Sequence, residues 1–329
     1  MGFRFVMAVG AAPDLDVENE FLKDEQVEVE FASLKTPEEV RRETVGADGV
    51  IVALEPLPTE LIDNFQPEVR IIGRAGIGLD AIDLEAARGR GVAVFHTPDY
   101  ATEEVATHAV AMILAANRRI VEGNGLARTD WESYEKLGSV IPLSEQVVGV
   151  VGLGRIGRAV VDRLRPLNPR IIGVDPFVTT SPDGVTLVST LEELLTSSDI
   201  VTLHLPLTPE TTKLIGPDEL GLLRAGATLV NVSRGRLIDE DALVDALESG
   251  RIHAALDVLA IEPPPADARI LSAPNVILSP HFAWYSDSSE RRVRTEVLRG
   301  MLEYLRGQPL TTGRLAVDPR DAEGDRDSG

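Results

Sequence analysis

The sequence predicts an α/β protein whose sheets are mainly parallel and covered by helices, and three observations lead to this expectation. Short apolar runs alternate with helical stretches, as in sheets whose strands are joined by helical crossovers. The 329 residues exceed one typical domain, so two domains are expected. A glycine-rich turn between a strand and a helix, near the middle of the chain, marks a second α/β run.

The first α/β run ends before residue 100 and is followed by a long helix. Thr36 as N-cap and Pro37 at the first helical position mark one helix start. Apolar residues at helical spacing from Thr102 to Arg119 predict a helix that could join two domains, and a loop-like stretch follows to about residue 146. Expected strands are residues 3–10, 27–33, 47–54, 69–76 and 92–97, and expected helices are residues 36–45, 59–65 and 83–91.

The second run begins at Val147 and predicts a doubly wound sheet. Its expected strands are residues 147–153, 170–176, 185–188, 199–206, 228–233, 254–259 and 275–281, with helices at 155–167, 190–198, 216–226 and 239–250. One more helix is expected over residues 286–307. The acidic, polar tail from about Gly313 is predicted to be disordered.

Composition limits the kinds of partner. The net charge is −21, from 32 basic and 53 acidic residues, so the surface repels nucleic acid and anionic lipid. Only four basic residues are lysines, which fits either adaptation to high salt or a GC-rich genome that favours arginine codons. The chain has no cysteine, which excludes disulfides and thiolate chemistry. Neither a membrane-spanning run nor a signal peptide is evident, so a cytoplasmic enzyme without nucleic-acid or membrane partners is expected.

The segment Gly152-Leu153-Gly154-Arg155-Ile156-Gly157 has the spacing of a dinucleotide-binding turn. Its three glycines allow a tight turn, a close approach to a pyrophosphate and packing of the helix on the strand, and the helix N-terminus favours the anion. Asp175 ends the next strand, 18 residues after Gly157, where it can accept hydrogen bonds from both ribose hydroxyls and would repel a 2′-phosphate. These features predict a Rossmann-type domain that binds NAD rather than NADP.

Three candidate catalytic side chains follow successive strands of the second run. Arg234, Glu262 and His281 should meet at one edge, because ligands bind at the carboxyl ends of parallel strands. A carboxylate beside the histidine favours its protonated, proton-donating form, and an arginine can bind a 2-oxo acid carboxylate at two points. Each residue alone has a simpler structural explanation, but the ordered set beside a nucleotide fold favours hydride exchange with a carbonyl.

The remaining histidines, His96, His108, His204 and His253, are expected to be structural, although His108 and His204 could border the cofactor. The chain has neither an HExxH pattern nor clustered Asp/His spacing, so no metal is expected.

The chain from about Ile71 to Trp284 resembles the D-isomer-specific 2-hydroxyacid dehydrogenases. The motifs "RAGIGLDAID", "GLGRIG", "VDP", "HLPLTPET", "NVSRGRLIDEDAL", "AALDV" with "EP", and "SPH" occur in the order typical of that family. The resemblance implies two Rossmann-like domains with a cleft between them. Residues 1–99 and 285–329 would form a discontinuous, flavodoxin-like substrate-binding domain, and residues 100–284 would form the NAD-binding domain. It also implies a homodimer built on the NAD domains.

The resemblance further implies roles for individual residues. Arg234 would bind the substrate carboxylate and carbonyl, His281 would be the acid/base, and Glu262 would be its partner. The loop Ala75-Gly76-Ile77 would offer backbone N–H groups to the substrate carboxylate. The residues implied at the cofactor are Gly152, Gly154, Arg155, Ile156, Gly157, Asp175, Val105, Leu205, Pro206, Thr211, Val232, Ser233, Asp257 and His281.

The ending "SPHFAWYSDSS" departs from the small residues that commonly follow the family's histidine. It resembles the C-terminal-binding-protein branch, whose eukaryotic members are NAD-sensing corepressors. Trp284 would border the substrate there, or would alternatively anchor the start of the next helix. The expected function is interconversion of a small 2-oxo acid and its D-2-hydroxy acid with NAD. The alternatives are an NAD(H)-sensing scaffold and a family member that acts on a non-carboxylate anion.

Overall fold

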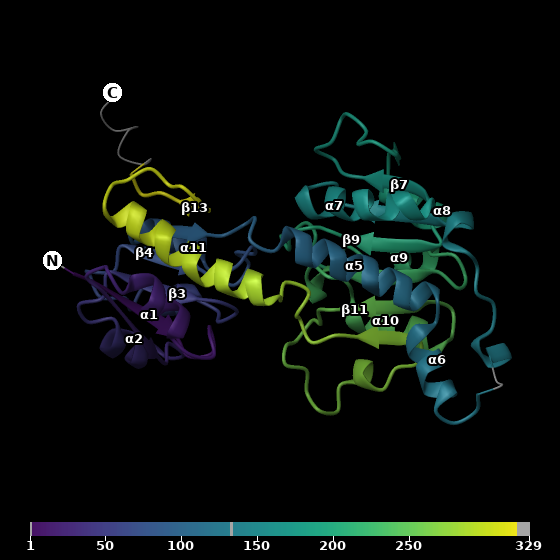
Figure 1. Ribbon diagram of the computed structural model, residues 1–329, viewed down its shortest axis with the longest axis horizontal. Coiled ribbons are helices and arrows are strands. Elements are labelled where there is room, and N and C mark those ends of the chain that lie inside the picture. Colours follow the sequence, from purple (N-terminus) through teal and green to yellow (C-terminus); the bar gives the residue numbers. More distant parts are fainter. Residues whose placement is uncertain (1, 132–133, 321–329) are drawn as a thin grey trace. The chain divides into compact units, whose positions relative to one another are not determined.

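The computed structural model describes residues 2–131 and 134–320, and the chain divides into two compact units (Figure 1). Unit 1 consists of residues 1–101 together with the chain from Ser286 onward, and unit 2 consists of residues 102–285. The chain therefore crosses from one unit to the other twice. Each unit is built around a sheet of its own, so the predicted two-domain α/β fold is confirmed.

Unit 1 contains a six-stranded sheet in the order β13-β5-β4-β3-β1-β2. Strands β1 to β5 are parallel to one another, and β13 is antiparallel to β5. The strands are β1 (Phe3–Ala8), β2 (Val27–Ala32), β3 (Gly49–Val52), β4 (Ile71–Arg74), β5 (Ala93–His96) and β13 (Arg314–Val317). The helices are α1 (Asp16–Leu22), α2 (Pro37–Glu43), α3 (Thr59–Ile62), α4 (Leu84–Gly89) and α11 (Asp287–Leu305).

Successive residues of these strands point to opposite faces of the sheet, and each face is buried. On one face Phe5 and Ile51 pack with Met301 of α11, and on the other Val6 and Val50 pack beneath α2 to α4. The predicted N-cap is present, because Thr36 accepts a hydrogen bond from the Glu39 N–H and Pro37 begins α2.

The prediction that the chain is disordered from about Gly313 is wrong for the residues that form β13. Leu315 pairs with Phe95 of β5, and Val317, 1% exposed, belongs to the core of unit 1. This short strand satisfies the free backbone edge of β5, a long-range contact that the polar composition of the tail concealed. Residues 321–329 lie outside the described residues.

Unit 2 contains a seven-stranded, entirely parallel sheet in the order β12-β11-β10-β9-β6-β7-β8. The strands are β6 (Val147–Val151), β7 (Arg170–Val174), β8 (Val185–Leu187), β9 (Ile200–Leu203), β10 (Thr228–Asn231), β11 (His253–Leu256) and β12 (Val276–Leu278). The helices are α5 (Thr102–Asn117), α6 (Ile120–Ala127), α7 (Arg155–Leu164), α8 (Leu191–Ser197), α9 (Pro217–Leu222) and α10 (Glu240–Glu248). Short 3₁₀ turns cover Tyr134–Leu137, Leu143–Glu145, Arg165–Leu167, Gly235–Leu237 and Arg269–Leu271.

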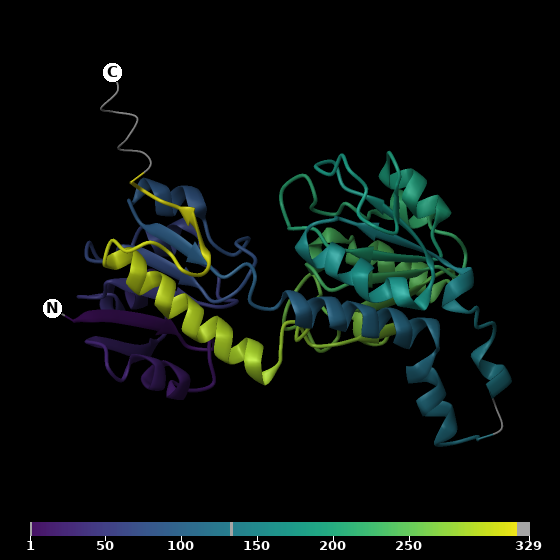
Figure 2. The same cartoon turned by 45° about the horizontal axis from the view of Figure 1, so that its top comes forward.

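The sheet of unit 2 is doubly wound. Helices α5 and α7 pack together on one face, and α8, α9 and α10 pack side by side on the other. The strand order reverses between β6 and β9, which is the position where such sheets bind ligands beyond the strand carboxyl ends. Helix α6 lies in the stretch that was predicted to be loop-like. It extends away from the sheet of unit 2 and buries none of its residues (Figure 2).

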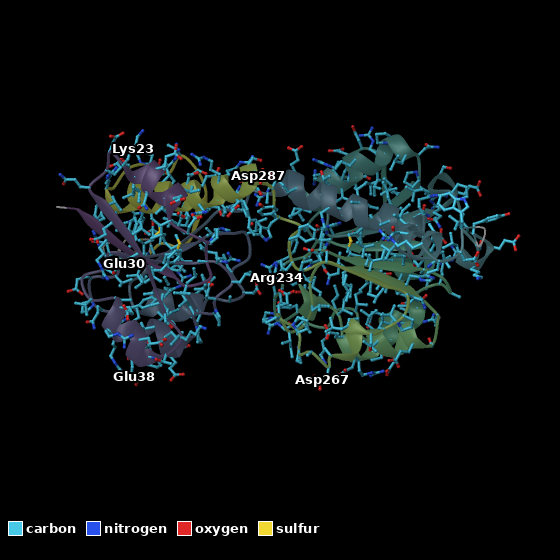
Figure 3. The ribbon with its side chains drawn as sticks, turned by 60° about the horizontal axis from the view of Figure 1, so that its bottom comes forward. Lys23, Glu30, Glu38, Arg234, Asp267 and Asp287 are labelled. Carbon is cyan, nitrogen blue, oxygen red and sulfur yellow. The ribbon has the colours of Figure 1, made fainter. Side chains whose placement is uncertain are left out.

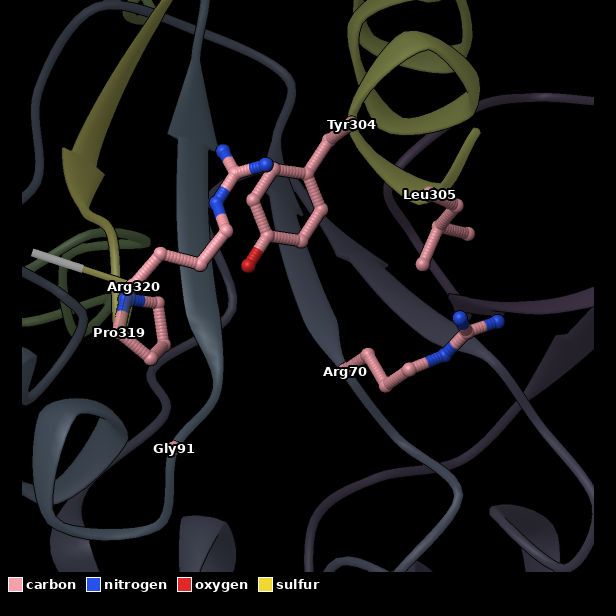
Figure 4. Close-up of a pocket in the computed structure, with 6 residues that line it drawn as sticks. All are labelled: Arg70, Gly91, Tyr304, Leu305, Pro319 and Arg320. Carbon is pink, nitrogen blue, oxygen red and sulfur yellow. The ribbon is translucent and has the colours of Figure 1, made fainter. Parts of the chain in front are cut away.

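A small cavity lies at the amino ends of β4 and β5 in unit 1 (Figure 4). Its volume is about 300 Å³, and its lining includes Arg70, Tyr304 and Arg320. Arg70 pairs with Asp48 at 2.5 Å, and Arg320 pairs with Asp318 at 2.7 Å. Because each guanidinium is neutralised by its own carboxylate, this cavity is not a strong anion site.

Candidate active site

The three predicted catalytic side chains all belong to unit 2, and two of them are in direct contact. Arg234 (labelled in Figure 3) follows β10, Glu262 follows β11 and His281 follows β12, so each lies beyond the carboxyl end of its strand. The Glu262 carboxylate hydrogen-bonds with Nδ1 of His281. The positive charge of Arg234 also contributes to lowering the pKa of the Glu262 carboxyl.

The environment of Glu262 determines its charge. Burial alone would raise the pKa of the Glu262 carboxyl, but hydrogen bonds from His281 and the Leu259 N–H, together with the charges of His281 and Arg234, outweigh it. The net effect lowers the pKa of Glu262. Near neutral pH the carboxylate that faces His281 is therefore ionised.

The backbone around Arg234 is held by its own strand end. The Asn231 side chain donates to the Arg234 carbonyl at 2.8 Å and accepts from the Ser233 N–H at 3.0 Å. A Cβ on Gly235 would lie 1.9 Å from the Leu259 carbonyl carbon, so only glycine lets the loops after β10 and β11 approach this closely. Asn231 and Gly235 were not predicted from the sequence, because only the fold shows what they contact.

The turn that carries His281 has an unusual backbone. The φ angle of His281 is +51°, in the left-handed region that non-glycine residues rarely adopt. The His281 N–H donates to the Asp257 carbonyl at 2.8 Å, and the indole Nε1–H of Trp284 donates to the His281 carbonyl at 3.0 Å. Trp284 thus contacts the backbone of the histidine. Its contact with substrate stays a prediction.

The glycine loop has the geometry that the sequence predicted. Gly152 has φ +91°, and a Cβ on it would lie 2.4 Å from the His204 carbonyl oxygen. A Cβ on Gly157 would lie 2.0 Å from the Gly152 carbonyl oxygen. In contrast, a Cβ on Gly154 would meet nothing within 4 Å. Open space beside Gly154, at the uncapped N-terminus of the ten-residue helix α7, fits a dinucleotide pyrophosphate.

Asp175 follows β7 and is tied to the glycine loop. Its Oδ2 accepts from the Leu153 N–H at 2.8 Å, and its Oδ1 accepts from the Phe177 N–H at 2.9 Å. These bonds hold a carboxylate beside the loop, where adenosine ribose hydroxyls bind in such folds. At the start of α7, Arg155 is exposed and Ile156 is half-buried.

The other residues implied at the cofactor lie on unit 2 as well. Leu205 and Pro206 follow β9, and Thr211 Oγ1 donates to the Pro206 carbonyl at 2.8 Å. Ser233 Oγ donates to the Leu203 carbonyl at 2.7 Å. Three of the predicted residues are buried, namely Val105 (6% exposed), Val232 (7%) and Asp257 (1%).

The loop Ala75-Gly76-Ile77 follows β4 of unit 1, where the first two N–H groups already have partners. The Ala75 N–H donates to the Val52 carbonyl at 2.8 Å, and the Gly76 N–H donates to the Arg74 carbonyl at 2.8 Å. The expectation that these two groups are offered to a substrate therefore does not fit this structure. Within this loop, the Ile77 N–H is the remaining candidate for binding the substrate carboxylate.

Among residues 2–131 and 134–320, no three acidic, histidine or cysteine side chains are grouped so as to hold a metal ion. In the same described part of the chain, no helix has the length and apolar character needed to span a bilayer.

Fold and site together define an NAD-binding α/β protein, and comparison of sequences identifies its family. Residues 110–283, more than half of the chain, match the family described as D-isomer specific 2-hydroxyacid dehydrogenase, NAD binding domain. The protein belongs to the D-isomer-specific 2-hydroxyacid dehydrogenase family. This confirms the resemblance inferred from the motifs at the level of the family and of its NAD-binding domain.

Two relatives illustrate the range of the family. D-3-phosphoglycerate dehydrogenase of Methanocaldococcus jannaschii is 38% identical over 290 residues, which cover 87% of this chain and 55% of the relative. Glycerate dehydrogenase of Methylorubrum extorquens is 32% identical over 289 residues, which cover 85% of this chain and 90% of the relative. The chain thus spans about half the length of the phosphoglycerate dehydrogenases that it matches.

Solved structures show the same fold. The TT0316 protein of Thermus thermophilus has a TM-score of 0.83 and 33% identity, covering 94% of this chain and 99% of that one. An NADPH-dependent glyoxylate/hydroxypyruvate reductase of Sinorhizobium meliloti, in complex with NADP and malonate, also has a TM-score of 0.83, with 30% identity over 95% of this chain and 97% of that one.

Proposed function

We propose that the protein is an NAD-dependent oxidoreductase that interconverts a small 2-oxo acid and its D-2-hydroxy acid. The observation that carries the proposal is the hydrogen bond between His281 and the ionised Glu262, whose pKa the charge of Arg234 also helps to lower. An imidazole and a guanidinium thus both follow strands of the one parallel sheet of an NAD-binding unit. Reduction of an anionic carbonyl compound requires both groups.

His281 is assigned the proton transfer. Its Nδ1 faces Glu262, so Nε2 is the nitrogen that gives a proton to the C2 oxygen during reduction and takes it back during oxidation. Nicotinamide, when bound, supplies or accepts the hydride at C2. Glu262 keeps the ring oriented and offsets the positive charge of its protonated form.

We assign binding of the substrate carboxylate to Arg234. A guanidinium binds a carboxylate at two points and can also polarise the neighbouring carbonyl. One of its nitrogens, Nη1, donates to the Ser233 carbonyl at 2.8 Å, which helps to fix the direction of the group. We attribute the preference for NAD over NADP to Asp175, whose carboxylate would repel a 2′-phosphate.

Two kinds of substrate side chain are candidates. The relatives are named for phosphoglycerate and glycerate. The aromatic residues Phe282 and Trp284 after His281 favour an apolar side chain instead. The assay therefore follows NADH oxidation by absorbance with glyoxylate, hydroxypyruvate, its phosphorylated form, and branched and thioether 2-oxo acids, at low and high salt.

The decisive variant is Arg234→Ala, with Arg236→Ala as the matched control because Arg236 is exposed and only two residues away. Loss of a two-point charged hydrogen bond should lower kcat/KM by at least about 100-fold for Arg234→Ala and leave Arg236→Ala unchanged. Equal turnover by wild type and Arg234→Ala would contradict the assignment. No turnover of any 2-oxo acid by a wild-type protein that binds NADH would contradict the activity itself.

The second candidate function is an NAD(H)-sensing scaffold, as the resemblance to the C-terminal-binding-protein branch suggests. The observation that favours it is the pair of aromatic side chains flanking the turn, Phe282 at 43% and Tyr285 at 48% exposed. Tight NADH binding without turnover in the same assay would support this candidate.

We further propose a homodimer built on unit 2. Helix α6 buries no residue, and the chain from it toward β6 exposes the large apolar side chains of Ile120, Val121, Trp131, Tyr134 and Ile141. Such a concentration of exposed apolar side chains is typical of a protein interface. Sedimentation equilibrium should give a dimer for wild type and a monomer for Ile120→Asp/Val121→Asp, whereas a wild-type monomer would exclude this interface.

A further inference from the structure

His108, expected from the sequence to be structural, contacts the turn that carries His281 at two points. It lies on α5, and its Nε2 is 3.1 Å from Ser279 Oγ. Its ring meets that of Phe282 edge-on, with 4.9 Å between the ring centroids. Because Ser279 precedes His281 by two residues and Phe282 follows it directly, a single side chain of α5 holds the turn on both sides of the histidine.

Asp257, which directly follows β11, holds the same turn. Its carboxylate is 1% exposed and accepts from Ser279 Oγ at 2.6 Å, from the Phe282 N–H at 3.2 Å and from the Ala283 N–H at 2.9 Å. Since the Ser279 hydroxyl donates to Asp257, its lone pair is available to accept the Nε2–H of His108. The hydrogen bonds thus form a chain from α5 through Ser279 to Asp257.

This support is important because of the backbone of His281. A residue with a side chain pays a conformational cost at φ +51°, and such a conformation persists only where its surroundings fix it. If the turn relaxed to an ordinary backbone conformation, the imidazole would move away from Glu262. An ångström of displacement at a reacting group can lower a rate by about 100-fold.

We propose that His108 is a positioning residue for His281: by holding Ser279 and Phe282, it keeps the turn in the conformation in which Nδ1 of His281 meets Glu262. The kinetic consequence rests on the function proposed above, whereas the structural consequence does not. His108 itself does not exchange a proton with the substrate in this proposal.

The first test is a double-mutant cycle between His108→Phe, which keeps a ring against Phe282 but has no N–H, and Ser279→Ala. Each single variant should lower kcat by about 10- to 100-fold with the Kd for NADH within about twofold of wild type. The double variant should be no worse than the worse single variant, because both changes break one chain of hydrogen bonds. His108→Gln, which retains a donor, should recover part of the rate.

The control is His253→Phe, because His253 also lies on unit 2, at the amino end of β11, and contacts Arg119 instead. It should leave kcat unchanged. Fully additive losses in the cycle, or a His108→Phe variant with wild-type kcat, would overturn the proposal. If His108→Phe does not fold, Ser279→Ala and His108→Gln carry the test.

The second test needs no substrate. The chain has five histidines, so the imidazole Cε1–H signals can be assigned in an NMR spectrum by replacing each histidine in turn. The His281 signal should shift in His108→Phe and Ser279→Ala but not in His253→Phe, and an unchanged signal would refute the positioning role. If no 2-oxo acid is turned over, the proposed function fails, yet this signal still decides the role of His108.

Discussion

Arg294 of α11 and Glu18 of α1 form a buried ion pair within unit 1. Arg294 Nε donates to Glu18 Oε1 at 2.8 Å, and Nη2 donates to Oε2 at 2.5 Å. Glu18 is fully buried and Arg294 is 5% exposed. The two residues are 276 positions apart, so the pair ties the returning end of the chain to its beginning.

Removing one partner of this pair should destabilise unit 1 strongly. Arg294→Met leaves the Glu18 carboxylate buried without its cation and should lower the free energy of unfolding by about 3–5 kcal/mol. Arg291→Met is the control, because Arg291 lies on the same helix in an exposed pair with Glu20 and should cost less than about 1 kcal/mol. Urea unfolding measures both, and similar losses in the two variants would show that burial of the pair is unimportant.

His204 should make the folded state sensitive to acid. Burial lowers the pKa of His204 to about 4, and its Nδ1 has no hydrogen-bond partner among the described residues. In the unfolded chain His204 takes up a proton near pH 6.5, whereas in the folded protein it does so only near pH 4. The free energy of unfolding is therefore unaffected by His204 above pH 6.5 and falls as the pH is lowered from 6.5 toward 4. Between pH 7.5 and pH 5, wild type should lose on the order of 2 kcal/mol more than His204→Gln. Equal losses would mean that His204 is solvated.

Glu262 should also make the folded state less stable on acidification, but at a lower pH than His204 does. The pKa of Glu262 is lowered in the folded state from its ordinary value of 4.5, so its stabilisation of the fold is present above that pH and is lost as the pH falls through the folded-state value. Acidification to about pH 3.5 should therefore destabilise wild type more than Glu262→Gln in urea unfolding. The same variant should lower kcat by at least about 10-fold at neutral pH, because the imidazole loses its counter-charge. An unchanged kcat would remove Glu262 from the mechanism.

His281→Gln should abolish most of the turnover and leave cofactor binding intact. Loss of general acid–base catalysis lowers kcat by about 100- to 10,000-fold. NADH binding, followed by fluorescence, should change little, because the glycine loop and Asp175 lie beyond other strands. Near wild-type kcat would show that another group transfers the proton.

Asp175 should determine the choice between NAD and NADP. Asp175→Asn keeps one side-chain oxygen that can accept from either the Leu153 or the Phe177 N–H, but it removes the charge that would repel a 2′-phosphate. The ratio of kcat/KM for NADH to that for NADPH should fall by about 10-fold or more. Asp175→Ala removes both features and should show the same shift together with weaker NADH binding. A constant ratio in both variants would disprove this account of cofactor choice.

Much of the site could be predicted from sequence because its signals are local. The glycine loop needs only its own spacing, and its φ angles and close contacts follow from a strand–turn–helix. Arg234, Glu262 and His281 were predicted to meet because parallel strands joined by helices place their carboxyl ends at one edge, and His281 does contact Glu262.

Features that depend on contacts between distant segments could not be predicted in this way. The polar tail hid β13, which exists because β5 leaves an unpaired edge. The loop at Ala75 and Gly76 was expected to offer N–H groups that the fold instead satisfies with Val52 and Arg74.

The sequence by itself determined the α/β class, the dinucleotide loop and the chemical groups of the candidate site. Each of these follows from backbone periodicity or from residue types at fixed spacing. Only the tertiary structure decided what supports them, such as the contact of His108 with Ser279, 171 residues away. A side chain's partner across the core depends on how helices and strands pack, and neither residue carries that information in its neighbouring sequence.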